Sequence, residues 1–331
     1  MTQKIIVLGS NSFSGAHFVK SALERQFEVF GISRSREPDP VFLPYHEVEQ
    51  HKKKFHFFQY DLNYDVDAII AVINDIKPEY IVNFAAQGMV AQSWEAPDQW
   101  FMTNFVSAVK LHQGLINSSF LKKFVQVSTP EVYGNCQGNV VETIQYNPST
   151  PYAVSKAAAD MSLMSFFRQY GFPVVFTRSA NVYGPCQQLY RIIPKAVLCF
   201  LKKETIELHG GGNSVRAFIH IGDVVEGTFR AMLSEKNGQI YHFATDEYIS
   251  IKELVKFISK KLYVPFNQYV KKARERPGKD DAYFLDCAKA GNELGWKSRI
   301  SLDRGLDETI AWVKNHFDIL KDIPCEYTHK L

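Results

Sequence analysis

The chain has 331 residues, of which 46% are hydrophobic and 22% charged, and its formal net charge is +3 at pH 7. These values are typical of a globular protein with about two domains. They exclude a transmembrane protein, because no apolar run approaches the ~18 residues needed to span a bilayer, and they indicate no nucleic-acid partner.

The five cysteines are scattered and form no spacing typical of a metal site or a disulfide framework. The first residues lead directly into a strand-like run without a cleavage site, so no signal peptide is expected. The sequence therefore predicts a cytoplasmic protein that binds no metal.

A strand, a small-residue turn and a helix open the chain. Residues 5–8 form a continuous apolar run, which is typical of a buried parallel strand. The turn contains Gly9 and Gly15, which permit a tight bend and close helix packing, and the free amides of the helix can hold a pyrophosphate. The pattern indicates a dinucleotide site, but its middle position is Ser12 rather than the usual glycine. An ordinary strand-to-helix turn is the alternative.

The second strand, residues 28–33, ends where NAD-binding proteins usually carry an acid for the ribose 2′-hydroxyl. Here the chain reads Ser33-Arg34-Ser35-Arg36. Guanidinium groups suit a 2′-phosphate better than a hydroxyl, so the sequence favours NADP over NAD. Solvated loop arginines are the alternative.

Further strands are expected at 55–60, 80–87, 124–128 and 174–178, with helices at 66–76, 98–117 and 152–170. This alternation predicts an α/β fold, a Rossmann-type doubly wound parallel sheet. Asp61 follows the third strand, where it contacts an adenine amine or caps the next helix. The small residues after Asn83 let the backbone approach a cofactor.

After residue 180 the pattern changes, with helices expected near 190–202, 223–234, 250–262, 286–295 and 303–316. We expect a dinucleotide-binding domain at 1–180 plus about 218–248, and a smaller mixed α/β substrate-binding lobe at 181–217 and 249–331. A cleft between two such lobes is a common place for a small-molecule site.

Two segments carry the chemistry. Ser128-Thr129-Pro130-Glu131-Val132-Tyr133-Gly134 follows a strand, and Tyr152-Ala153-Val154-Ser155-Lys156 starts a helix. Tyr152 and Lys156 are four residues apart and share one helix face. A hydroxyl, a carboxylate, a phenol and an ammonium in one cleft can move a proton and a hydride on an alcohol carbon. The alternative is that Tyr152 and Lys156 simply belong to the first turns of an amphipathic helix and have no catalytic role.

These segments resemble the extended short-chain dehydrogenase/reductases, the NAD(P)-dependent nucleotide-sugar epimerases and dehydratases. The similarity runs from end to end, and within the family it is greatest to the dTDP-glucose 4,6-dehydratases. It rests on the Gly9 to Gly15 turn, Asn83-Phe84-Ala85-Ala86, the Ser128 to Gly134 segment, Tyr152-x-x-x-Lys156, Arg276-Pro277-Gly278-Lys279-Asp280 and Leu294-Gly295-Trp296.

The resemblance implies an enzyme of the lyase class that makes a 4-keto-6-deoxy sugar nucleotide, acts as a homodimer and uses helices 98–117 and 152–170 for dimerisation. The implied catalytic residues are Thr129, Glu131, Tyr152 and Lys156. The implied cofactor-binding residues are Gly9, Ser12, Phe13, Ser14, Gly15, Ser33, Arg34, Arg36, Asp61, Leu62, Ala85, Ala86, Gln87, Asn104, Tyr152 and Lys156. The implied substrate-binding residues are Ser93, Thr129, Glu131, Asn181, Arg216 and Arg276.

Each catalytic residue has a role that fits its chemistry. A lysine cation and the positive nicotinamide favour the phenolate of Tyr152, which takes the proton of the sugar 4-hydroxyl. Thr129 hydrogen-bonds O4, and Glu131 takes the C5 proton that oxidation at C4 has made acidic. Arg216 and Arg276 suit a pyrophosphate, with ion pairs between the lobes as the alternative.

Two positions depart from the family pattern. Pro130 stands where the dTDP-glucose enzymes carry an acid that protonates the leaving hydroxyl, and Ala217 stands where relatives often carry aspartate. GDP-mannose 4,6-dehydratases also lack an acid at the first position. The alternatives are therefore a 4-epimerase, a 4-oxidase or a decarboxylase on the same scaffold, and a non-catalytic NADP-binding protein.

Overall fold

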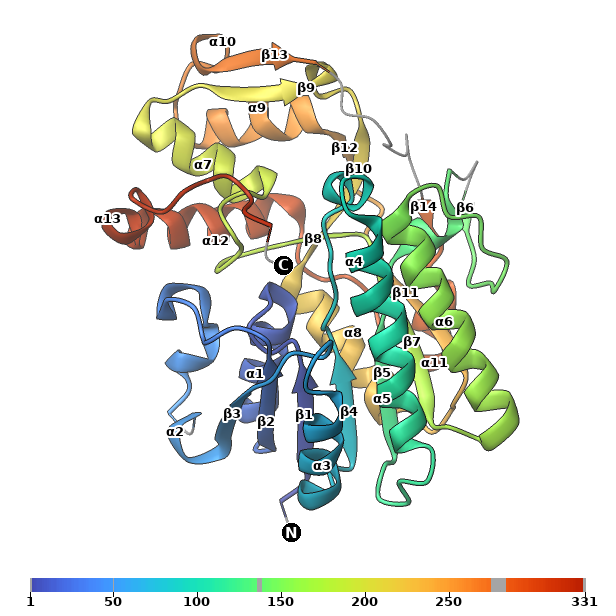
Figure 1. Ribbon diagram of the computed structural model, residues 1–331. Helices are drawn as coiled ribbons and strands as arrows, with labels where there is room; N and C mark the ends of the chain where they lie inside the picture. Colours follow the sequence, from blue (N-terminus) through green and yellow to red (C-terminus); the bar gives the residue numbers. More distant parts are fainter. Residues whose placement is uncertain (1, 50, 136–138, 275–283, 330–331) are drawn as a thin grey trace.

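The computed structural model describes residues 2–49, 51–135, 139–274 and 284–329. A seven-stranded parallel sheet forms its centre, with strand order β11-β7-β5-β4-β1-β2-β3 (Figure 1). The strands are β1 (Lys4–Leu8), β2 (Glu28–Ser33), β3 (Phe55–Gln59), β4 (Tyr80–Asn83), β5 (Lys123–Val127), β7 (Val174–Ser179) and β11 (Gln239–Phe243). The chain runs outward in both directions from β1 and β4, so the carboxyl ends of these strands form a topological switch point, where doubly wound sheets bind ligands.

Helices cover both faces of this sheet, which confirms the predicted doubly wound fold. One face carries α1 (Phe13–Glu24), α8 (Ile221–Leu233) and α11 (Ala288–Leu294). The other carries α3 (Val66–Ile76), α4 (Pro97–Phe101), α5 (Ala108–Leu115) and α6 (Pro151–Tyr170).

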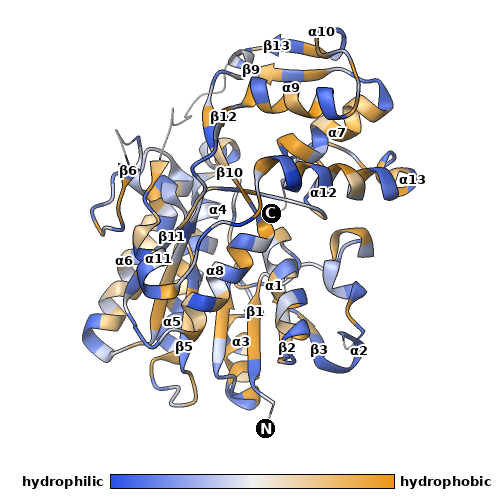
Figure 2. Ribbon diagram, turned by 180° about the vertical axis from the view of Figure 1, so that it is seen from behind, coloured by the Kyte–Doolittle hydropathy of each residue, from blue (hydrophilic) through white to orange (hydrophobic). Residues whose placement is uncertain are grey.

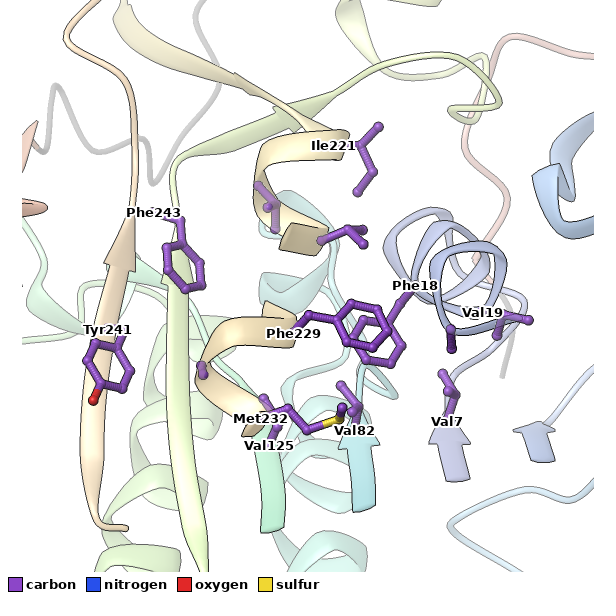
Figure 3. Packing of buried hydrophobic residues seen from close by; sticks show 14 of the residues in the cluster. Val7, Phe18, Val19, Val82, Val125, Ile221, Phe229, Met232, Tyr241 and Phe243 are labelled. Atoms are coloured by element: carbon purple, nitrogen blue, oxygen red, sulfur yellow. The ribbon is translucent and has the colours of Figure 1, made fainter. Parts of the chain in front are cut away.

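Strand residues alternate between two cores. Ile5 and Val7 pack under α1 and α8, while Ile6 and Leu8 pack under α3 and α5. Strands buried on both faces have no polar side, which explains their continuous apolar sequences. On the first face, the rings of Phe18 and Phe229 stack at 4.2 Å and join α1 to α8 (Figure 3). Figure 2 shows hydrophobic strands between helices whose outer faces are hydrophilic.

A second, smaller part is built around its own hydrophobic cluster. Its helices are α7 (Ile192–Lys202), α9 (Ile251–Lys261), α10 (Phe266–Tyr269), α12 (Leu302–Asn315) and α13 (Phe317–Leu320). Its strands are β8 (Asn181–Tyr183), β10 (Val215–His220) and β12 (Tyr248–Ser250) in one sheet, and β9 (Ile206–His209) with β13 (Val270–Ala273) in another. The mixed α/β lobe predicted from the sequence corresponds to this part, while the exact domain boundaries stay a prediction.

The remaining elements are short. They are the helix α2 (His51–Lys54), the strand pair β6 (Asn139–Val140) and β14 (Phe284–Leu285), and the 3₁₀ turns η1 (Pro40–Phe42), η2 (Pro44–Glu47), η3 (Ala91–Trp94), η5 (Pro130–Tyr133) and η6 (Gly210–Gly212). No helix in the described ranges is long and apolar enough to cross a membrane.

Two predicted elements need correction. The strand predicted at 80–87 ends at Asn83, because the side chain of Asn83 accepts a hydrogen bond from the amide of Ala85 and turns the chain. The helix predicted at 98–117 spans α4 to α5 but contains a π-helical stretch, η4 (Met102–Ser107). π-Helical stretches often mark functional positions, and Asn104 lies inside this one.

Candidate active site

The glycine turn brings β1, α1 and β4 into close contact. Gly9 has φ of +78°, and a Cβ there would lie 2.7 Å from the amide nitrogen of Ala85. A Cβ on Gly15 would lie 2.2 Å from the carbonyl oxygen of Gly9. Ser12 is the N-cap of α1 and accepts a hydrogen bond of 3.1 Å from the amide of Gly15. The serine thus performs the cap function that a glycine at this position could not.

Asn11 connects this turn to the segment after β2. Its side-chain nitrogen donates to the carbonyls of Ser35 at 2.9 Å and Arg36 at 3.1 Å. Its amide donates to the hydroxyl of Ser33 at 3.1 Å. Within the described part of the chain, the side-chain oxygen of Asn11 is buried without a hydrogen-bond partner. A buried acceptor without a partner, beside the N-terminus of α1, fits a site that binds a nucleotide.

Other predicted cofactor residues have structural roles in the turns and core next to the glycine turn. Asp61 accepts a hydrogen bond from the amide of Asn63 at 2.8 Å and so stabilises the turn before α3, whose N-cap is Asp65. The side chain of Leu62 is in the core beneath α3. Phe13 is buried in the core on the α1 face, and Ser14 follows it in the first turn of α1.

Asn104 holds the segment after β4 in place. Its side-chain oxygen accepts from the amide of Gln87 at 2.8 Å, and its nitrogen donates to the carbonyl of Gln87 at 3.0 Å. The same nitrogen donates to Ser155 on α6 at 2.9 Å. Asn104 therefore fixes the loop that contains Ala85 and Ala86 against the helix that carries Tyr152 and Lys156.

The predicted catalytic loop is a compact turn. Thr129 is the N-cap of η5, and its hydroxyl accepts from the amide of Glu131 at 3.3 Å. Pro130 is the first residue of η5, where its fixed φ is favourable and its missing N–H is not needed. The proline thus stiffens the turn that presents Glu131.

Tyr152 lies in the first turn of α6, close to this loop. The helix is capped by Thr150, which accepts from the amide of Ala153 at 3.1 Å, and Ser93 accepts from the amide of Tyr152 at 3.2 Å. Burial and the charge of Glu131 raise the pKa of Tyr152, while a hydrogen bond with Thr129 and the charge of Arg191 lower it. The protein alone therefore keeps the phenol protonated, and lowering its pKa requires a further positive charge.

Lys156 lies one turn further along α6. Its ammonium donates to the carbonyl of Val127, the last residue of β5, at 2.8 Å. Burial lowers the pKa of Lys156, and the charge of Asp160 acts in the opposite direction. The structure brings Thr129, Glu131, Tyr152 and Lys156 together at the carboxyl end of β5, as the sequence predicted.

Two of the predicted substrate-binding residues, Asn181 and Arg216, lie on neighbouring strands. Asn181 is on β8 and pairs with Phe218 of β10, and Arg216 lies two residues earlier on β10. Arg276 lies outside the described residues. Ala217 is buried and pairs with Tyr248 of β12.

Three charged residues near this site were not predicted from the sequence. Arg191 precedes α7, and nothing in its loop indicated that its charge reaches Tyr152. Asp160 and Arg178 form an ion pair of 2.8 Å whose side chains are 0% exposed. Asp160 could have been found from its spacing, because it follows Lys156 by four residues, and Arg178 from its place in an apolar strand.

A Rossmann-type sheet with a glycine turn and a Tyr-x-x-x-Lys helix defines the NAD-dependent epimerase/dehydratase class of the extended short-chain dehydrogenase/reductases. Comparison with known proteins identifies the family within this class. The model of the GDP-mannose 4,6 dehydratase family matches residues 6–309, and the chain belongs to this family.

Similar proteins include the dTDP-D-glucose 4,6-dehydratase of Homo sapiens, 29% identical over 97% of this chain and 93% of the human protein. The dTDP-glucose 4,6-dehydratase of Streptomyces venezuelae, solved with NAD and TYD bound, has a TM-score of 0.88 at 28% identity over 96% of this chain and 98% of that one. The UDP-glucose 4-epimerase of Thermotoga maritima, solved with UDP-glucose, has a TM-score of 0.86 at 26% identity over 95% of this chain and 100% of that one.

Proposed function

We propose that this protein is a nucleotide-sugar 4,6-dehydratase that removes water across C5 and C6 and yields a 4-keto-6-deoxy sugar nucleotide. The observation that carries this proposal is the carboxylate of Glu131 beside Tyr152, at a distance where its charge alters the pKa of the phenol. A base next to the proton-transfer residue is required for elimination, whereas epimerisation at C4 needs none. The family and the dTDP-glucose 4,6-dehydratase relatives support this reading.

The residues of the chain act in sequence. A bound oxidised nicotinamide supplies a hydride acceptor, returns the hydride to C6, and brings the positive charge that lowers the pKa of Tyr152. Lowering even an unperturbed phenol pKa of ~10 by about 3 units requires about 4 kcal/mol, and the raised pKa of Tyr152 requires more. Tyr152 then takes the proton of the 4-hydroxyl while Thr129 orients O4. Glu131 removes the C5 proton, which the 4-keto group has made acidic.

Pro130 leaves Glu131 as the acid as well as the base. Once Glu131 has taken the C5 proton, it is a neutral carboxylic acid and can donate that proton to the leaving 6-hydroxyl. This requires both groups to lie on one face of the sugar. The turn that begins with Pro130 is stiff, so it can hold one carboxyl group within reach of both the C5 proton and the leaving 6-hydroxyl.

The cofactor is a nicotinamide dinucleotide, with NADP preferred. The two acids nearest the end of β2 are engaged elsewhere: Glu37 accepts from the hydroxyl of Tyr45 at 2.5 Å, and Asp39 accepts from the amide of Val41 at 2.9 Å. Arg34 and Arg36 are the basic residues that follow Ser33. Similar solved structures contain NAD, so the proposed preference for NADP rests on Arg34 and Arg36 of this chain alone.

Incubation with a panel of sugar nucleotides, followed by mass spectrometry, tests the activity. The expected product of the true substrate has lost one water and contains a ketone. Products of unchanged mass from every sugar nucleotide would refute the proposal. An isomeric product would instead indicate a 4-epimerase, the second candidate, which the similarity to the Thermotoga maritima epimerase favours.

We also infer a homodimer that works in the cytoplasm. Exposed apolar side chains gather on the helices predicted to dimerise: Met102 is 45% exposed, Val106 and Val154 are 37% exposed, and Met161 is 61% exposed. A second copy of this chain would cover them through the same helices. Sedimentation equilibrium that gave the mass of a single chain, 37.9 kDa, would contradict the dimer.

A further inference from the structure

A buried ion pair lies beneath the catalytic loop and belongs to neither of the predicted binding sites. The guanidinium of Arg178 on β7 donates to the carboxylate of Asp160 on α6 at 2.8 Å, and both side chains are 0% exposed. Removing two charges from water is costly, and a buried ion pair is therefore weak evidence for a role in stability. The contacts of the pair indicate another role.

Each member of the pair holds one end of the catalytic loop. Asp160 accepts a hydrogen bond of 2.5 Å from the hydroxyl of Ser128, where the loop leaves β5. Arg178 donates to the phenol of Tyr133, the last residue of η5. Thr129 and Glu131 lie between these two anchors. The loop is therefore fixed at its beginning and at its end by one charged unit.

The anchor at Tyr133 continues to the edge of the sheet. The phenol of Tyr133 lies 2.8 Å from Nε2 of His242 on β11, and Nδ1 of His242 lies 3.2 Å from the carbonyl of Asp286. Burial and the charge of Arg178 lower the pKa of His242 to about 3, so its imidazole is neutral. A neutral ring that donates from Nδ1 accepts at Nε2. The Tyr133 hydroxyl therefore donates to Nε2 of His242 and accepts from the guanidinium of Arg178.

We propose that Asp160, Arg178 and Tyr133 are positioning residues that hold the Ser128–Tyr133 loop so that Glu131 faces the C5 proton of the sugar. This inference rests on the proposed function, because it takes Glu131 to be the eliminating base. Displacing a catalytic group by about 1 Å can cost about 10²-fold in rate, so a loop held at both ends supports the chemistry without touching the substrate.

Asp160 also acts on the charges of the site. Its carboxylate raises the pKa of Lys156 and the pKa of Tyr152. Tyr152 also interacts with the charges of Glu131 and Arg191. Lys156 interacts with His112 on α5, and burial lowers the pKa of His112 to about 3, so its imidazole is neutral. Removing the Asp160 charge should lower both pKa values and shift both limbs of the pH profile toward acid.

A matched pair of variants tests the positioning role. Tyr133 and Tyr146 both accept a hydrogen bond from Arg178, but only Tyr133 belongs to η5. Tyr133→Phe should lower kcat for water loss by tenfold or more, about 1.4 kcal/mol, with KM changed by less than about twofold. Tyr146→Phe should lower kcat by less than about threefold. Equal losses in the two variants, or no loss in Tyr133→Phe, would overturn the proposal.

Asp160→Asn supplies a readout that a purely structural role would not move. The rate of C4 oxidation, followed as formation of reduced cofactor, should show both limbs of its pH profile at lower pH than in the unchanged protein. A profile reduced in height but not shifted would overturn the role of Asp160. Each alternative activity begins with the same oxidation, so this test stays decisive if no water is lost. Absence of water loss in the unchanged protein would refute only the proposed function.

Discussion

At the scale of single residues, Glu131 decides between elimination and simpler chemistry. Glu131→Gln removes the base and also a negative charge that raises the pKa of Tyr152. We expect water loss to fall by roughly 10²- to 10⁴-fold, the usual contribution of a general base. Oxidation at C4 should continue, so reduced cofactor should accumulate in absorbance measurements. Full dehydratase activity in this variant would show that another group removes the C5 proton.

Arg34 and Arg36 determine the expected cofactor preference. Hydrogen bonds to a charged phosphate are worth about 1.5–3 kcal/mol, so replacing either arginine by alanine should lower the ratio of NADP to NAD affinity by about tenfold or more. Arg25→Ala is the control, because Arg25 pairs with Glu226 at 2.6 Å between α1 and α8. Titration calorimetry with both cofactors measures the ratio. An unchanged ratio of NADP to NAD affinity in both arginine variants would show that Arg34 and Arg36 do not select the cofactor.

At the scale of secondary-structure elements, the π-helical stretch has a defined task. Asn104→Ala would leave the backbone of Gln87 without two buried hydrogen bonds. Each unsatisfied group costs about 1–3 kcal/mol, so urea unfolding should show a loss of roughly 2–6 kcal/mol, and cofactor affinity should fall. Asn63→Ala is the control, because Asn63 bonds Thr103 and Ser107 of the same stretch. Equal cofactor affinities in both variants would contradict a role in cofactor binding for the hydrogen bonds between Asn104 and Gln87.

The elements with strong local signals were the ones that could be predicted. The apolar strand at 5–8 and the helix from Tyr152 carry their own pattern and capping residues, and both occur as expected. The π-helical stretch could not be predicted, because Asn104 acts through Ser155, a partner distant in sequence. The end of β4 was missed although its cause is local, since Asn83 accepts from the amide of Ala85 within an otherwise strand-like apolar run. The placement of Tyr152 and Lys156 on one helix face was predictable from their spacing, whereas Arg191 affects Tyr152 only because the fold brings the two residues together.

At the scale of the whole molecule, residues 324–329 form a strap between the two parts of the protein. In the smaller part, Glu326 pairs with Lys195 of α7 at 2.7 Å, and the ring of Tyr327 packs edge-on against Tyr190 at 5.2 Å. On the sheet side, the ring of His329 stacks on Trp100 of α4 at 5.0 Å. The strap therefore joins α7 to α4.

The strap also passes close to the predicted cofactor residues. Burial raises the pKa of Tyr327, and the charges of Arg34 and Arg191 act against this increase. Tyr327 thus lies within electrostatic reach of one arginine at the end of β2 and of another that reaches Tyr152. We therefore expect a segment in this position to restrict the separation of the two parts when a dinucleotide is bound.

A chain that stops after Ile323 should therefore release its cofactor faster than the full chain. Without the strap, α4 and α7 lose their shared contact, and their amide protons should exchange more rapidly. Stopped-flow fluorescence measures cofactor release, and hydrogen exchange measures the opening. Lys321→Ala is the control, because Lys321 pairs only with Asp318 within the same turn in the described structure. Unchanged release in the shortened chain would show that the strap stabilises the fold alone, and slower release would show that it competes with the cofactor.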